Sequence, residues 1–108
     1  LESLKGEKLT AIKAIGARFF GMNLYKIQMQ SANMDQTDFR RCDMEESDMR
    51  GSSFKGARFN HAHVRGSNFE PLMFGGGEGT KRFNPCSFEN ASLTYADFSN
   101  CKLRMANF

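Results

Sequence analysis

Three cysteines are the residues with the most obvious chemical potential in this sequence. Cys42, Cys86 and Cys101 could bind a metal, form a disulfide or carry out redox chemistry. Their number is odd, however, and their spacings match no zinc-binding pattern. Each stands two residues before a large apolar residue, at a position that elsewhere holds Ala or Ser. We therefore interpret them as small buried side chains with free thiols, which are typical of a reducing compartment.

The histidines and the acidic residues are better explained as surface residues than as a metal or catalytic site. His61 and His63 could form a metal pair, but no third ligand is evident near them, so we predict no metal site. The acidic run DMEESD at 43–48 could mimic the paired carboxylates of a hydrolase. Arginines flank it on both sides, which favours a solvated wall of balanced charge. We predict no catalytic residues and no cofactor.

The composition is that of one soluble globular domain. The 108 residues are 40% hydrophobic and 25% charged, and the net charge is +3 with both signs interleaved. This charge is too mild to indicate direct nucleic-acid binding. No apolar run approaches the roughly 18 residues that span a bilayer, so we expect no membrane association.

A large apolar residue recurs at every fifth position. In the segment 37–59 these residues are Phe39, Met44, Met49, Phe54 and Phe59. A helix, at about 100° per residue, would scatter them over all its faces. A straight strand would send successive ones to opposite sides. The chain must therefore turn every five residues.

Apart from one interruption, the five-residue units from residue 17 to residue 108 share an internal pattern. The residue two positions before the large one is small, with Met22, Ile27 and Leu72 as larger exceptions, the residue between them is often Asp or Asn, and the last two are mostly polar or Gly. Two inward positions, one outward position and a two-residue corner make the unit. This pattern resembles the pentapeptide-repeat family, whose consensus is a small residue, Asp or Asn, Leu or Phe, and two variable residues.

The resemblance implies an all-β fold, a right-handed quadrilateral β-helix in which four pentapeptides make one turn. Sixteen full repeats would give a solenoid of about four coils, on the order of 20 Å high at the usual strand spacing. Stacked coils would bury a continuous core that one coil could not make.

The period fails at residues 77–85, GEGTKRFNP. Either all nine residues form a loop at a corner, or only Gly77–Thr80 is inserted and 81–85 is a degenerate repeat centred on Phe83. The second alternative would point Lys81 into the core, so we favour the full loop. That choice predicts one column of Phe19, Phe39, Phe59, Phe88 and Phe108. It predicts that the next column holds Leu24, Met44, Val64 and Leu93.

The two ends of the solenoid would expose unpaired strand edges and core residues unless something covers them. Residues 1–16 are expected to form an N-terminal cap, either a short helix ended by Gly16 or a degenerate first coil, since Leu4, Leu9 and Ala14 keep the spacing. Without a cap, strand edge and core would be exposed. Because Phe108 is itself a core position, we expect either further chain in a larger protein or self-association through the C-terminal coil.

Two surface features are candidate partner-binding sites. On the four-sided assignment, one face carries Arg18, Arg40, Arg41, Arg58 and His61, with Asp38 between two of the arginines. This face could hold an acidic partner or be a salt-bridge ladder between coils. The interruption is the second candidate, as a recognition loop or a tolerated insertion. Its candidate contact residues are Glu78, Lys81, Arg82 and Phe83.

The predicted function is a non-catalytic protein–protein interaction module with a protein partner, and not an enzyme. The family resemblance implies a scaffold within a larger protein such as a bacterial effector. The expected location is the reducing cytoplasm, or the host cytosol for a secreted effector. The alternative is a DNA-mimicking protein that binds DNA gyrase, of the quinolone-resistance type. DNA mimicry requires a strongly acidic surface, in contrast to the net charge of +3.

Overall fold

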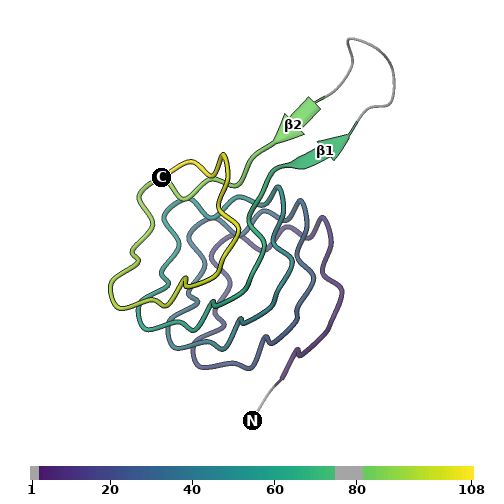
Figure 1. The fold of residues 1–108 in the computed structure, drawn as a ribbon. Coiled ribbons are helices and arrows are strands. Elements are labelled where there is room, and N and C mark those ends of the chain that lie inside the picture. The colour runs from purple at the N-terminus through teal and green to yellow at the C-terminus, as the bar shows by residue number, and fades with distance from the viewer. Residues whose placement is uncertain (1–2, 75–81) are drawn as a thin grey trace.

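The chain winds into a stack of coils, a β-helix solenoid from which one hairpin projects (Figure 1). This computed structural model describes residues 3–74 and 82–108. The hairpin strands are β1, Leu72–Phe74, and β2, Arg82–Asn84. The described residues contain no helical segment with the length and hydropathy of a transmembrane span.

Neighbouring coils are joined by single parallel bridges at the residue before each large apolar one. Up to residue 68, bridged residues are twenty apart, as in Arg18 to Asp38 and Asp38 to Arg58. Four pentapeptides therefore separate equivalent positions. The Phe39 N–H donates to the Arg58 carbonyl at 2.8 Å, and the Asp38 N–H donates to the Ala17 carbonyl at 2.9 Å. The backbone groups that one coil leaves unpaired are thus satisfied by the coils on either side.

Residues 3–16 form a coil of the solenoid and not a helix. Parallel bridges join Ser3, Lys8 and Lys13 to residues 23, 28 and 33. Of the two forms expected for the N-terminal segment, the structure has the coil. Leu4, Leu9 and Ala14 pack against the core from its edge, so the apolar spacing that continues into this segment reflects real packing.

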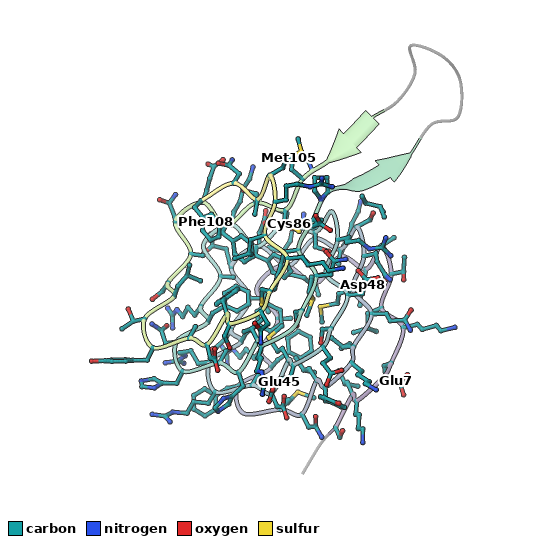
Figure 2. The ribbon with its side chains drawn as sticks, viewed as in Figure 1. Glu7, Glu45, Asp48, Cys86, Met105 and Phe108 are labelled. Carbon is teal, nitrogen blue, oxygen red and sulfur yellow. The ribbon has the colours of Figure 1, made fainter. Side chains whose placement is uncertain are left out.

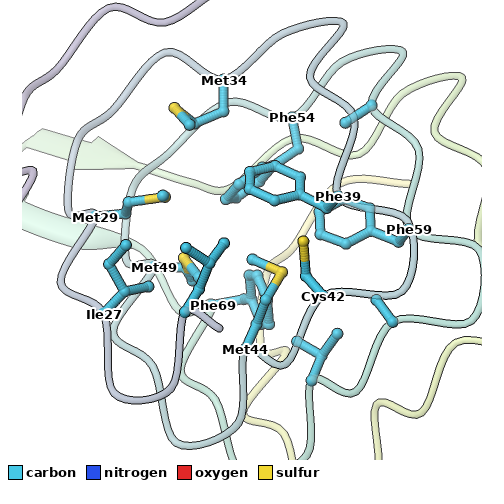
Figure 3. Packing of buried hydrophobic residues seen from close by; sticks show 14 of the residues in the cluster. Ile27, Met29, Met34, Phe39, Cys42, Met44, Met49, Phe54, Phe59 and Phe69 are labelled. Carbon is cyan, nitrogen blue, oxygen red and sulfur yellow. The ribbon is translucent and has the colours of Figure 1, made fainter. Parts of the chain in front are cut away.

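The core is filled by columns of large side chains, seen from close by in Figure 3. The rings of Phe19 and Phe39 stack at 5.5 Å between centroids, and those of Phe39 and Phe59 at 5.1 Å. These columns bury most of the large apolar side chains of the central coils. Polar side chains surround the stack, including the exposed Glu7 (Figure 2).

The small inward position is also a hydrogen-bonding position. The side chains of Ser47 and Ser67 donate to the carbonyls of Leu24 and Met44, at 3.2 and 2.7 Å. The thiols follow the same rule: Cys42 donates to the Phe19 carbonyl, Cys86 to that of Met49 and Cys101 to that of Val64. Burial raises the pKa of the Cys42 and Cys86 thiols to about 11, so both are neutral near pH 7.

The outward Asp or Asn makes the corner that follows it. Its Oδ1 accepts a hydrogen bond from the backbone N–H two residues later, at 2.9 to 3.2 Å. This Asx turn is a mechanism by which these residues favour a change of chain direction. It occurs at Asn23, Asn33, Asp38, Asp43, Asp48, Asn68 and Asp97. Asp43 and Asp48 of the acidic run are therefore corner-forming residues, a role beyond the solvated wall that the sequence suggested.

Each corner places its second residue in the left-handed region, with one exception described below. The non-glycine residues there are Ala11, Lys26, Ser31, Gln36, Arg41, Glu46, His61, Asn90, Tyr95, Asn100 and Met105, with φ between 54° and 63°. A side chain with a Cβ is strained in this region by about 1–2 kcal/mol. The fold therefore accepts a small strain at many corners.

Ala11→Gly is expected to stabilise the protein by about 0.5–1 kcal/mol, because Gly adopts φ near 62° without that strain and loses only a methyl group. The matched control is Ala14→Gly, at an inward position without positive φ, which should destabilise. Urea unfolding of both variants measures the difference. A loss of stability in Ala11→Gly as large as that in Ala14→Gly would contradict the strain argument.

The interruption is longer than the sequence suggested, and both predicted forms of it are wrong. Bridges that span it join residues 34 apart, as in Ser53 to Ser87, whereas Ser87 and Asn107, both after it, are again twenty apart. The fourteen residues from Leu72 to Pro85 are therefore outside the coil register. The strands β1 and β2 pair antiparallel, with Met73 opposite Phe83. Phe83 is thus the partner of a hairpin strand and not the centre of a degenerate repeat, and the pentapeptide at Phe74 belongs to the hairpin.

This longer insertion changes the predicted columns. The ring of Phe88 stacks on that of Phe54 at 5.3 Å, and Phe108 stacks on Phe88 at 5.0 Å. The bridge from Arg58 to Ser92 places Leu93, not Phe88, in register with Phe59. The predicted column that placed Phe88 directly after Phe59 is therefore wrong by one side of the coil. The second predicted column is wrong in the same way, because the bridge from His63 to Asp97 places Phe98, not Leu93, after Val64.

Pro71 explains where the chain leaves the coil. It occupies the second corner position, where the other described corners have positive φ. The proline ring holds φ near −65°, so this corner cannot close in the usual way. The chain continues outward into β1 instead and returns through β2 to Cys86.

Candidate functional site

A groove of about 430 Å³ lies along one face of the solenoid. We call it the arginine groove. Its lining residues are Gly16, Arg18, Gln36, Asp38, Arg40, Gly56 and Arg58. They come from three consecutive coils, and backbone bridges hold Arg18, Asp38 and Arg58 in one column. The sequence placed these three residues in the same stack, and the structure has them there.

Asp38 and Arg40 form a fixed pair within the groove. Arg40 donates from Nε to Asp38 Oδ1 at 2.9 Å and from Nη2 to Oδ2 at 2.8 Å. Its guanidinium also lies 5.2 Å from the centre of the Phe20 ring. These hydrogen bonds from Arg40, aided by the charge of Arg58, lower the pKa of Asp38 below its ordinary value. The Asp38 carboxylate is therefore ionised and already engaged near pH 7.

Arg18 and Arg58 have no such partner. Both are exposed, and neither forms an ion pair with any residue that the structure describes. Three guanidinium groups face one carboxylate, so two positive charges in the groove are uncompensated. A salt-bridge ladder along this face, the plainer alternative, therefore extends only to the Asp38 and Arg40 pair.

The two free arginines also stand where the fold favours another residue. The outward position holds a corner-forming Asp or Asn in many repeats, and an arginine side chain has no acceptor for that hydrogen bond. Arg18 and Arg58 thus give up a local stabilising contact. Lys8 and Lys102 give up the same contact on another column, so what distinguishes Arg18 and Arg58 is that both line one groove with Arg40.

Gln36 and Gly56 shape the wall of the groove. Gly56 has φ of 67°, and a Cβ built on it would collide with the side chain of Gln36. The Gln36 amide therefore lies directly over the Gly56 backbone. It contributes a donor and an acceptor at the middle coil of the groove, next to Asp38.

Arg41 and His61 do not line the groove, although the sequence grouped them with its residues. Both are second corner residues, with φ of 59° and 61°. The His61 ring stacks on that of Tyr95 at 5.0 Å, and Tyr95 is 79% exposed. The sequence does not predict the contact of Tyr95 with His61, because the alignment of the two residues depends on the length of the insertion.

The candidate residues of the interruption are only partly placed. Glu78 and Lys81 lie outside the described residues. Arg82 and Phe83 belong to β2, where their backbones pair with Phe74 and Met73.

A second hollow in the described part of the chain has no comparable excess of charge. This hollow of about 460 Å³ beside Pro85 contains Lys55 and Glu89, which balance each other. Within residues 3–74 and 82–108, no group of three or more His, Cys, Asp or Glu side chains is arranged to hold a metal ion. The arginine groove is therefore the candidate functional site.

Asp38→Asn should lower stability at pH 7 by up to about 1 kcal/mol, the range of exposed ion pairs. The amide keeps an oxygen for the Arg40 N–H, so the corner is retained while the charge is lost. Because folding lowers the pKa of Asp38, its contribution is present above the ordinary value near 3.8 and disappears as the pH falls through the folded value. The gap between wild type and variant in urea unfolding should begin to narrow below about pH 4 and close once Asp38 is protonated in the folded protein. A gap independent of pH would contradict this account.

Comparisons with known proteins agree with the coil geometry. The model of the family described as pentapeptide repeats matches in eight copies, at residues 15–51, 32–70 and 82–108. No curated protein matches the sequence. Among solved structures, HetL from the cyanobacterium Nostoc sp., a pentapeptide repeat protein involved in regulation of heterocyst differentiation, superposes with a TM-score of 0.77 at 18% identity. The match covers 96% of this chain and 44% of HetL, so the chain spans less than half the length of that protein.

Two other solved structures superpose more loosely. A pentapeptide repeat protein from the Arabidopsis thaliana thylakoid lumen has a TM-score of 0.42 at 22% identity, covering 94% of this chain and 68% of its own. Trypsin-treated QnrB1, a plasmid-mediated fluoroquinolone resistance protein, has a TM-score of 0.43 at 15% identity, covering 94% and 58%. Neither likeness is close enough to support an argument, whereas that to HetL supports the fold. With the family model matched over most of its length, the chain belongs to the pentapeptide-repeat family.

Proposed function

We propose that this chain is a non-catalytic protein-interaction module that binds an acidic protein partner through the arginine groove. The observation that carries the proposal is the pair Arg18 and Arg58. They leave two positive charges unpaired in one groove, at positions where the fold favours Asp or Asn. Charge complementarity of this kind steers a partner and fixes its orientation.

The rigid solenoid suits such a role. We infer that it is a four-sided β-helix of about four coils, because bridges recur every five residues and pair positions twenty apart, and right-handed, as membership of the family implies. Its backbone bridges fix the spacing of the outward side chains before any partner arrives, which reduces the entropy lost on binding.

We further propose a reducing compartment as the place of action, the cytoplasm or the host cytosol. All three cysteines are free, and each thiol hydrogen-bonds to a backbone carbonyl instead of facing another thiol. The DNA-mimicking alternative finds no support in the arginine groove, whose charge is positive.

Partner capture with matched charge reversals tests the proposal. The variant Arg18→Glu/Arg58→Glu reverses the groove. Lys8→Glu/Lys102→Glu makes the same change of net charge at the same repeat position on another column of the solenoid. Crosslinking of purified protein in lysate should yield an acidic partner with wild type and with the lysine variant, and lose it with the arginine variant. Equal recovery by the two variants would overturn the proposal, provided that thermal unfolding shows both to be folded.

A further inference from the structure

We propose that the arginine groove recognises an acidic peptide segment in the polyproline II conformation, with carboxylates three residues apart that pair with Arg18 and Arg58. This inference rests on the proposed function and specifies its partner. It follows from the spacing of the two free arginines, from the engaged carboxylate between them and from the groups around the groove.

The spacing of the arginines favours this conformation. Arg18 and Arg58 are separated by one intervening coil, which carries Asp38 in the same column. At about 4.8 Å between paired strands, their backbones lie about 10 Å apart along the solenoid axis. A polyproline II helix has three residues per turn and a rise of about 3.1 Å, so residues i and i+3 share a side at about 9.3 Å. In a β-strand the same-side residues are about 7 or 13 Å apart, and fit less well.

The middle of the groove favours an uncharged pair of residues between the two acids. The Asp38 carboxylate is held in the groove by Arg40, at 2.8 and 2.9 Å. A third acidic side chain on the peptide would face this carboxylate and be repelled. The Gln36 amide beside it offers a donor and an acceptor. A polyproline II backbone makes no internal hydrogen bonds and has free groups to meet that amide.

The rim of the groove adds apolar surface. Phe20 is 54% exposed and is held against Arg40, 5.2 Å from its guanidinium. Aromatic surface is the usual contact for the rings of a proline-rich peptide. The groove thus combines two separated positive charges with an aromatic edge, which suits an acidic and proline-containing segment.

Peptide titration tests the spacing directly. The full chain, labelled with ¹⁵N, is titrated at low salt with three capped peptides: Gly-Glu-Pro-Pro-Glu-Gly, the adjacent-acid isomer Gly-Glu-Glu-Pro-Pro-Gly and the neutral Gly-Gln-Pro-Pro-Gln-Gly. Inorganic phosphate is a fourth ligand. We expect the spaced-acid peptide to bind about two- to fivefold more tightly than its isomer, because only it can engage both arginines. The neutral peptide should not bind, and phosphate should bind more weakly than the spaced-acid peptide.

Variants of the protein assign the binding to the groove. Arg18→Glu/Arg58→Glu should weaken the affinity for the spaced-acid peptide by more than about tenfold, since it replaces two attractions by repulsions. Lys8→Glu/Lys102→Glu should leave this affinity unchanged. Equal affinity for the two acidic peptides, binding of phosphate as tight as that of the peptide, or indifference to the arginine variant would each overturn the inference. If the peptides fail while the arginine variant still loses the captured protein partner, the peptide geometry is wrong and the proposed function stands.

Discussion

Phe54→Ala should destabilise the protein by about 3–5 kcal/mol, the range observed when a fully buried phenylalanine is truncated. The Phe54 side chain is 0% exposed. Its ring contacts four others, with centroid distances of 5.9 Å to Phe39, 5.5 Å to Phe59, 5.8 Å to Phe69 and 5.3 Å to Phe88. Because these rings are anchored to several different coils, they cannot all move to fill the space. Urea unfolding followed by circular dichroism gives the free energy.

The control for this truncation is Phe20→Ala. Phe20 is the same residue type on the surface, where it is 54% exposed. Its loss should cost less than about 1 kcal/mol. A domain of this size has a total stability of about 5–15 kcal/mol, so the Phe54 variant should approach the limit of folding while the Phe20 variant remains far from it. Similar losses in both would show that the phenylalanine columns are not the main source of stability.

Removing the hairpin should leave a continuous solenoid, provided that Pro71 is also replaced. Deletion of Leu72–Pro85 turns the 34-residue spacing between Ser53 and Ser87 into the twenty residues of the other coils. The corner so formed requires positive φ at residue 71, which proline cannot adopt. We therefore expect the deletion with Pro71→Gly to unfold cooperatively near the wild-type temperature. The same deletion with Pro71 retained should be less stable by more than about 1 kcal/mol.

The reactivity of the Cys86 thiol shows whether the coil is intact next to the deletion. Cys86 is buried directly after the junction, and its pKa of about 11 keeps it unreactive at pH 8. Modification by a disulfide reagent should stay slow in the deletion with Gly at residue 71 and become fast in the deletion that keeps Pro71. Equal rates and equal stability in the two deletions would show that Pro71 is not what opens the corner.

The five-residue period predicts most of the fold, because few backbone structures can bury large apolar residues at the spacing of Phe39, Met44 and Phe54. The sequence predicts the hydrogen bonds of the corners only in part. The pattern showed that Asp and Asn precede the large residue, but not that Oδ1 of Asp38 accepts from the Arg40 backbone. That hydrogen bond depends on the dihedral angles of the turn, which the spacing alone does not specify.

Apolar periodicity alone does not predict where the insertion begins. Phe74 follows Phe69 by five residues, so apolar periodicity alone assigns it to the coil. Pro71 indicates instead that the coil is interrupted here, since its ring excludes the φ that this corner needs. Recognising that requirement needs the positive φ of the other corners, which only the structure provides.

The sequence predicts the candidate site better in the coils before the hairpin than in those after it. Arg18, Asp38 and Arg58 precede the hairpin, so the twenty-residue interval aligned them correctly. Tyr95 follows the hairpin, and its contact with His61 could not be found without the length of the insertion. The difference between the paired Arg40 and the unpaired Arg18 depends on side-chain geometry, which is beyond what spacing can specify.

The hairpin at Pro71 also shows how such a chain can change in length during evolution. A residue added within a side of the coil would shift every later core position, whereas fourteen residues added at a corner leave the later bridges in place. Insertions should therefore accumulate at corners, next to residues that cannot adopt the left-handed backbone. Related sequences are then best aligned in blocks of five, with gaps allowed only between blocks. A proline at the end of a block would mark where a new recognition element can be accommodated without disturbing the core.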